Sequence, residues 1–219
     1  MAKSRIDAVV FDLGGVLVRI ARGWNDAHRL AGFAADHPML SSEDFHRRSA
    51  AAAHAHQVGA ITPDEWAAAV AEASEGAYSP ADALAILDAW TIEEYPGIRE
   101  VIDLIHDAGL TTAALSNTNA RHWDLLGATD ANFRDYPNLG ALHQLHASHL
   151  LRQAKPDPAI YDAFLDAAEL RAARVLFFDD LAENVGAARR HGWSARQIDH
   201  TADPAGQIRS ALRQHRIID

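Results

Sequence analysis

The sequence predicts an α/β protein with a doubly wound, mainly parallel, Rossmann-like sheet and an inserted helical cap. Three observations support this prediction. Short apolar strands alternate with helical segments over the C-terminal half of the 219-residue chain, the order that gives a parallel sheet covered by helices on both faces. A strand near the N-terminus and another near residue 175 both end in aspartate. Between the first strand and the alternating half lies an alanine-rich stretch with helical spacing and no convincing strand.

The two acid-tipped strands predict a metal site. The first strand, residues 8–11, is an apolar run that ends in Asp12 and is followed at once by two glycines. The second, residues 175–178, ends in Asp179 and Asp180. Adjacent parallel strands would bring these three carboxylates to one edge of the sheet, where they repel one another unless a cation lies between them. The pattern therefore indicates a hard divalent metal ion.

The remaining core elements follow from hydrophobic spacing and turn residues. Gly109 and Gly192 end two of the helices, since glycine readily adopts the left-handed conformation of a helix C-terminus. Pro158 suits the first turn of another helix. We expect helices over residues 98–108, 158–169, 181–191 and 205–214, and strands over residues 110–115, 142–146 and 195–198.

The stretch from Arg19 to Trp90 interrupts this alternation. Helical spacing recurs over residues 65–73 and 81–90, and Thr62 begins a helix with proline and acids in its first turn. We expect two domains: an α/β core of residues 1–18 and 91–219, and a helical cap of residues 19–90 that covers the sheet edge. The alternative is that these helices are simply part of one compact core.

Composition excludes several classes of function. A net charge of −10 argues against nucleic acid or an anionic membrane as the main partner. The chain has no cysteine, which excludes disulfides, thiolate catalysis and Cys-based zinc sites. No long apolar segment and no signal peptide are recognisable, so a cytoplasmic location is expected. Oligomeric state is not predicted.

Four segments at the ends of predicted strands or in turns contain the candidate site residues. In chain order they are Asp12-Leu13-Gly14-Gly15, Ser116-Asn117-Thr118-Asn119, Lys155-Pro156-Asp157-Pro158 and Asp179-Asp180-Leu181-Ala182. Together they resemble the four signature motifs of the haloacid dehalogenase-like hydrolase superfamily, over residues 6 to about 193. The residues in these motifs are most similar to those of the branch that includes α-D-glucose-1-phosphate phosphatase.

The resemblance implies a Mg²⁺-dependent phosphatase that hydrolyses a small phosphorylated metabolite, with a sugar phosphate as the expected substrate. Asp12 would be the nucleophile and would carry an aspartyl-phosphate intermediate. Lys155 would place a positive charge against Asp12 and the phosphoryl group, while Ser116 and the amide of Asn117 would bind phosphate oxygens. The expected metal ligands are Asp12, the carbonyl of Gly14, Asp179 and Asp180, without a prediction of which of the last two binds directly.

The chain departs from the family at Gly14. Most phosphatases of the superfamily have a second aspartate there, two positions after the nucleophile, which acts as general acid and base. Such catalysis typically contributes about 10²–10⁴-fold. We therefore expect slow turnover, unless a cap residue such as Glu43, Asp44 or His46 supplies the proton.

Two alternative functions stay open. A metal-independent 2-haloacid dehalogenase also lacks the second aspartate, but it does not need the paired acids Asp179 and Asp180. A weakened enzyme kept as a binding or regulatory protein is compatible with Gly14, whereas intact Asp12 and Lys155 argue against it.

Residues of the cap should decide the substrate. Candidates to line the pocket are Trp24, His28, His46 and Arg47, although each also suits a packing or surface position. The pairs His54 with His56 and His143 with His146 are interpreted as scattered, partly exposed histidines, so zinc is not assigned. Neither acid-tipped strand is followed by a dinucleotide-binding glycine pattern, and a dinucleotide cofactor is not expected.

Overall fold

The core of the protein is a five-stranded parallel sheet with the strand order β5-β4-β1-β6-β7. The computed structural model describes residues 6–219, so residues 1–5 of the expected core lie outside the described part. The predicted doubly wound α/β fold is confirmed, and the strand bounds differ from the predicted ones by at most two residues. The strands are β1 (Ala8–Phe11), β4 (Thr111–Ser116), β5 (Gln144–Ala147), β6 (Val175–Asp179) and β7 (Ser194–Gln197).

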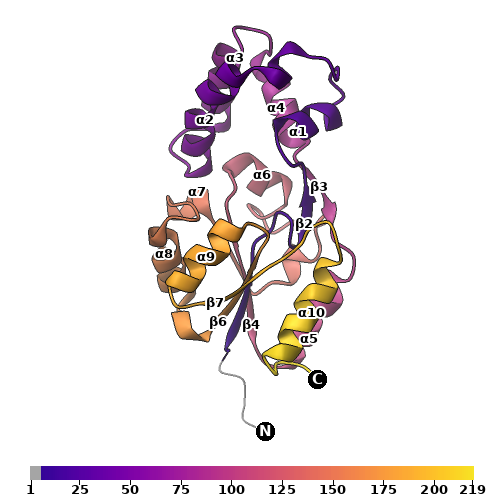
Figure 1. Ribbon diagram of the computed structural model, residues 1–219, viewed down its shortest axis with the longest axis vertical. Coiled ribbons are helices and arrows are strands. Elements are labelled where there is room, and N and C mark those ends of the chain that lie inside the picture. Colours follow the sequence, from indigo (N-terminus) through magenta and orange to yellow (C-terminus); the bar gives the residue numbers. More distant parts are fainter. Residues whose placement is uncertain (1–5) are drawn as a thin grey trace.

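Helices cover both faces of this sheet, as Figure 1 shows. Alternate side chains of β1 point to opposite faces: Val9 and Phe11 pack with one set of helices, and Val10 packs with the other. All three are fully buried, as expected for the central strand of a sheet covered on both sides. One face is covered by α5 (Ile98–Asp107) and α10 (Pro204–Gln214), and the other by α8 (Pro158–Ala168) and α9 (Ala182–Arg190).

The C-terminal edge of the sheet is where the predicted motifs meet. Phe11 pairs with Ala114 of β4 on one side and with Phe178 of β6 on the other. The residues that follow these three positions therefore lie at the same level along the strands. Two short helices complete this edge, α6 (Ala120–Leu125) and α7 (Ser148–Leu151). The 3₁₀ turns Leu139–Ala141 and Ala172–Arg174 instead precede β5 and β6.

Four further helices lie beyond the sheet edge, with a hydrophobic cluster of their own (Figure 1). The predicted helix start at Thr62 is present: its side chain accepts from the amide of Glu65, whose carboxylate accepts from the amide of Thr62. The cluster includes Phe45, Trp66, Val70, Tyr78 and Ile86. The helices are α1 (Trp24–Leu30), α2 (Glu43–Gln57), α3 (Pro63–Ala73) and α4 (Pro80–Asp88), with a 3₁₀ turn at Pro38–Ser41.

A two-stranded antiparallel ribbon connects these helices to the core. It pairs β2 (Val18–Ile20) with β3 (Thr91–Glu94), and Val18 lies opposite Glu94. The expectation of no strand after Arg19 is therefore wrong at its first residues. A three-residue strand carries almost no periodic signal, and its partner is more than seventy positions away. Within residues 6–219, no helix has the length and hydrophobicity of a membrane span.

Candidate active site

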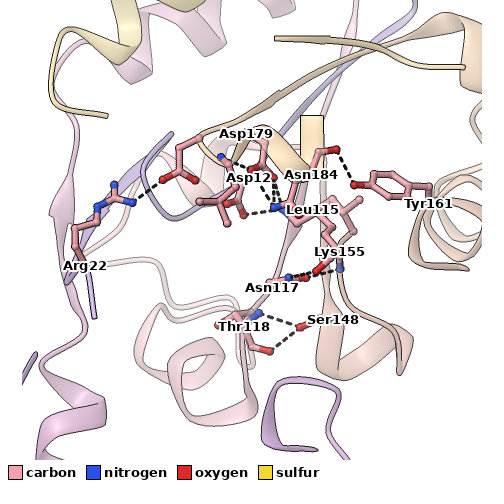
Figure 2. A network of polar contacts seen from close by, with 12 residues as sticks. Asp12, Arg22, Leu115, Asn117, Thr118, Ser148, Lys155, Tyr161, Asp179 and Asn184 are labelled. Atoms are coloured by element: carbon pink, nitrogen blue, oxygen red, sulfur yellow. Dashed lines mark hydrogen bonds and ion pairs between the residues drawn. The ribbon is translucent and has the colours of Figure 1, made fainter. Parts of the chain in front are cut away.

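The structure brings the three predicted carboxylates together. Ligand atoms of Asp12, Asp179 and Asp180 all lie within 4.8 Å of one another, and all three residues are buried. The amide of Asp12 donates to the carbonyl of Phe178 at 2.8 Å, which extends the pairing of β1 and β6 by one step. The strand ends thus hold the acids in place. Figure 2 shows the polar contacts around Asp12 and Asp179.

Lys155 is the cation of this cluster. Its ammonium group lies 2.7 Å from Oδ2 of Asp179 and 3.1 Å from Oδ1 of Asp12, and it donates to the carbonyl of Leu115 at 2.8 Å. The side chain is fully buried. Burial alone would lower the pKa of Lys155, but the charges of Asp12 and Asp179 outweigh that effect and hold the pKa above its ordinary value. Lys155 therefore stays protonated.

The carboxyl group of Asp12 has an unusual affinity for a proton. Burial, opposed by Lys155 and reinforced by Asp179 and Asp180, raises the pKa of Asp12 to about 7. Its Oδ1 is buried and accepts no hydrogen bond, although the ammonium of Lys155 is near. A divalent cation would bind that free oxygen and offset the repulsion among the acids. The donor set, all oxygen, suits Mg²⁺.

The two acids at the end of β6 have different partners. The carboxylate of Asp179 accepts from Lys155, from the amide of Leu181 at 2.9 Å, and from the side-chain amide of Asn184 at 3.1 Å to each oxygen. The carboxylate of Asp180 instead forms an ion pair of 2.5 Å with Arg22. Asp179 is thus engaged on both oxygens by neighbours in the core, whereas Asp180 reaches toward the cap.

Sequence reasoning missed the role of three of these neighbours. Arg22 follows β2 and gave no signal, since its partner Asp180 is 158 positions away. Asn184 was not among the predicted site residues, but its side-chain amide donates to both carboxylate oxygens of Asp179. The hydroxyl of Tyr161 donates to the carbonyl of Asn184 at 2.9 Å and so supports that contact. Tyr161 and Asn184 follow the motif segments that begin at Lys155 and Asp179, and their spacing from those residues was the available signal.

Asn117 holds the Lys155 loop rather than only forming a turn. Its side-chain oxygen accepts from the amide of Lys155 at 2.9 Å, and its side-chain NH₂ donates to the carbonyl of Lys155 at 2.7 Å. These two hydrogen bonds connect the end of β4 to the segment before α8. Ser116, at the last position of β4, is buried and faces a cavity above the sheet edge.

That cavity has a volume of about 360 Å³ and lies between the core and the four outer helices. Its floor includes Gly14, Ser116 and Asn117, which belong to the same loops as the acids. Its other walls are mainly apolar and aromatic. They include Ile20, Trp24, Trp66, Val70, Leu87 and Trp90.

Of the four candidates to line the pocket, Trp24 lines the cavity, whereas the other three occupy the packing or surface positions that each also suited. His28 is fully buried among the outer helices, where its ring contacts the hydroxyl of Tyr78 at 3.0 Å. His46 and Arg47 are exposed on α2 and do not line the cavity. Glu43 and Asp44, considered as proton donors with His46, do not line it either.

Of the pair His54 and His56, His54 is exposed as interpreted, whereas the interpretation of His56 as partly exposed was wrong. Both line the cavity together with His122, and His56 is buried. Burial, together with nearby His122 and His149, lowers the pKa of His56 to about 4, so the ring is uncharged at neutral pH. The ring of Trp66, on α3, stacks on His56 with 5.5 Å between the ring centroids.

Two sets of contacts close the outer helices onto the core. On one side His122 donates from Nε2 to the carbonyl of Leu87 at 2.7 Å, and Arg121 pairs with Asp88 at 2.6 Å. On the other side the hydroxyl of Ser148 contacts the carbonyl of Gln57 at 2.7 Å. The cavity is therefore enclosed between α2 and α4 above and the loops of the sheet edge below.

Fold and site together define a hydrolase with a carboxylate centre under a helical cover. The chain belongs to the haloacid dehalogenase-like hydrolase family, whose model matches residues 6–192. It is 29% identical to phosphatase MT3486 of Mycobacterium tuberculosis, over 94% of this chain and 92% of that protein. It is 31% identical to (S)-2-haloacid dehalogenase 1 of a Pseudomonas species, over 54% of this chain and 50% of that protein.

Solved structures agree with the family assignment. An HAD-family enzyme from Bacteroides thetaiotaomicron superposes with a TM-score of 0.75 at 22% identity, covering 90% of this chain and 96% of that one. Another structure of that enzyme, with a TM-score of 0.68, contains magnesium and inorganic phosphate. At this level of identity, the likeness establishes the fold.

Proposed function

We propose that this protein is a Mg²⁺-dependent phosphatase that acts on a small phosphorylated metabolite. The observation that carries the proposal is the cluster of Asp12, Asp179 and Asp180 around the buried ammonium of Lys155. Three buried acids with one lysine and one arginine leave an excess of negative charge that a divalent cation would neutralise. The phosphatase among its relatives, and the magnesium and phosphate in a structural neighbour, support the same conclusion.

Asp12, the carbonyl of Gly14 and Asp180 would hold the metal. Asp179 already accepts hydrogen bonds on both oxygens, so its role is to fix Lys155 and to complete the negative field. Asp180 would exchange its ion pair with Arg22 for the metal. When bound, Mg²⁺ supplies the charge that lets a carboxylate approach a phosphate dianion.

The remaining steps use residues of the chain. One carboxylate oxygen of Asp12 attacks phosphorus, the bond from phosphorus to the ester oxygen breaks, and the leaving alkoxide takes a proton from solvent. Lys155, Ser116 and the amide of Asn117 bind the phosphoryl oxygens. Water then attacks the aspartyl-phosphate, and inorganic phosphate leaves with Asp12 regenerated.

Gly14 has a consequence for rate. No carboxylate stands two positions after Asp12, and the candidate donors Glu43, Asp44 and His46 lie outside the cavity. Proton transfer to the leaving group is therefore left to solvent. We expect slow turnover that improves as the leaving group becomes less basic.

A dehalogenase is the second candidate. The relative from Pseudomonas favours it, as does the missing second aspartate. The paired acids argue against it, because attack on carbon requires no metal and buried acids without a cation are costly. A weakened enzyme that only binds its ligand is a third reading, which the intact Asp12 and Lys155 disfavour.

One experiment separates the three. The protein is incubated with p-nitrophenyl phosphate, glucose 1-phosphate and 2-chloropropionate, each with Mg²⁺ and with EDTA. We expect phosphate release that requires Mg²⁺ and disappears in Asp12→Asn. Halide release in EDTA would establish the dehalogenase, and no turnover on any substrate would favour the binding protein. Glucose 1-phosphate tests the expectation of a sugar phosphate.

A further inference from the structure

We infer that the group attached to the phosphate is apolar and contains a planar ring, rather than being a sugar. This inference rests on the proposed phosphatase function and adds the class of substrate. Its basis is the cavity between the sheet edge and the outer helices, whose lining is neutral and rich in aromatic side chains.

The described part of the protein contributes no carboxylate, ammonium or guanidinium group to the lining. Within the described residues, none of those that line the cavity is Asp, Glu, Lys or Arg. Trp24, Trp66 and Trp90 face it from three different segments, accompanied by Ile20, Val70 and Leu87. Apolar surface of this kind stabilises an apolar ligand roughly in proportion to the area that it removes from water.

Several polar side chains of the lining are already engaged with the protein. Both ends of the Asn117 amide bond to Lys155. The oxygen of Asn119 accepts from the amide of His122, its NH₂ faces Nδ1 of the same ring, and Nε2 of that ring contacts the carbonyl of Leu87. A sugar would bring several hydroxyl groups into this space, and each one left without a partner weakens binding.

The aromatic rings offer flat surfaces. The rings of Trp24 and Trp66 are 6.4 Å apart at 52°, and the ring of His56 stacks on Trp66 at 25°. His56 also keeps its buried Nε2 without a hydrogen-bond partner. An aromatic ligand gains from contact with such faces, and a single polar substituent on it would satisfy the free nitrogen.

The cavity is continuous with the site of chemistry. Gly14 follows Asp12 by two residues, and Ser116 and Asn117 are the expected phosphate ligands; all three form its floor. A phosphate held at the sheet edge therefore directs its ester group upward, between α2 and α4. The volume of about 360 Å³ falls at the small end of ligand pockets, which suits one or two fused rings.

The test compares two primary alkyl phosphates, so that leaving-group basicity is matched. These are 2-naphthylmethyl phosphate and glucose 6-phosphate, each assayed with Mg²⁺, and acetyl phosphate serves as a substrate too small to reach the cavity walls. We expect kcat/KM to be about 10- to 100-fold higher for the naphthyl ester, the gain that burying an aromatic side chain of this size gives.

A variant that fills the cavity tests its location. Ala53→Phe places a ring in the lining from an exposed position of α2, so the fold should tolerate it. We expect kcat/KM for the naphthyl ester to fall at least tenfold, with acetyl phosphate unchanged. Ala51→Phe is the matched control, since Ala51 is exposed on the same helix and does not line the cavity.

Binding is measured separately with 2-naphthylmethylphosphonate, which cannot be hydrolysed, by quenching of tryptophan fluorescence. Quenching in the wild type and Ala51→Phe, with loss in Ala53→Phe, supports the inference. A preference for glucose 6-phosphate, or equal effects of the two variants, overturns it while leaving the phosphatase intact. Binding of the phosphonate without turnover of any phosphate ester would overturn the phosphatase instead.

Discussion

The sheet edge and the cavity above it differ in the charged side chains that they contain. At the sheet edge, buried charges face one another: three carboxylates, one lysine and the guanidinium of Arg22. In the cavity above, no carboxylate, lysine or arginine lines the wall within the described residues, and the polar side chains of Asn119 and His122 are bonded internally. The first region is suited to stabilising charge as it develops on phosphorus, and the second to removing apolar surface from water. Under the proposed function, chemistry and substrate choice would be physically separate.

The largest effect should come from the nucleophile. Asp12→Asn removes the attacking oxygen and keeps the shape, so we expect kcat to fall by roughly 10⁴-fold or more. The fold should survive, because one fewer acid leaves Asp179 and Asp180 balanced by Lys155 and Arg22. Steady-state assays give the rate, and thermal melting in EDTA shows whether the variant melts at or above the wild-type temperature. Residual activity within tenfold of wild type would remove Asp12 from the mechanism.

Lys155→Met should show that the sheet edge depends on charge balance. The substitution leaves Asp12 and Asp179 buried without their cation, which typically costs about 3–5 kcal/mol of unfolding free energy. Urea titration in EDTA measures this loss, and Mg²⁺ should restore part of it. The matched control is Arg99→Met, an exposed partner of Asp103, whose loss should cost about 0–1 kcal/mol. Equal losses in the two variants would contradict the comparison between buried and exposed charges.

The two regions also differ in how far the sequence predicts them. Asp12 and Asp179 were predicted because each follows an apolar strand and parallel strands end at one edge, whereas the place of Lys155 was predicted from the resemblance to the family motifs. The cavity could not be predicted in the same way. His56 and Trp66 come from different helices, and which side of α2 faces inward depends on its packing against α3 and α7. That packing buries His56 and leaves His46 and Arg47 exposed.

Asn117 tests whether the Lys155 loop needs to be held in place. Asn117→Ala removes both hydrogen bonds to the backbone of Lys155, each worth about 1 kcal/mol. We expect kcat to fall about 10- to 30-fold, since the lysine is positioned less well, with the charge cluster itself intact. Asn117→Asp keeps the acceptor for the amide of Lys155 and should recover part of the rate. A variant that melts earlier but turns over at the wild-type rate would assign Asn117 a purely structural role.

The smallest effect concerns the neutrality of the cavity. The pKa of His56 is lowered to about 4 by burial and by nearby His122 and His149, so the folded state resists a proton that the unfolded state accepts near pH 6.5. Stability from this group is therefore present above pH 6.5 and is lost as the pH falls toward 4.

His56→Asn should remove that dependence, making the variant relatively more stable than wild type at pH 5 by on the order of 1 kcal/mol, after allowance for solvent screening. Urea midpoints at pH 7 and pH 5 measure the difference, and His54→Asn, at an exposed position of the same helix, should follow the wild type. Parallel curves for wild type and His56→Asn would mean that the cavity accepts a charge as readily as water does, and the contrast with the sheet edge would be lost.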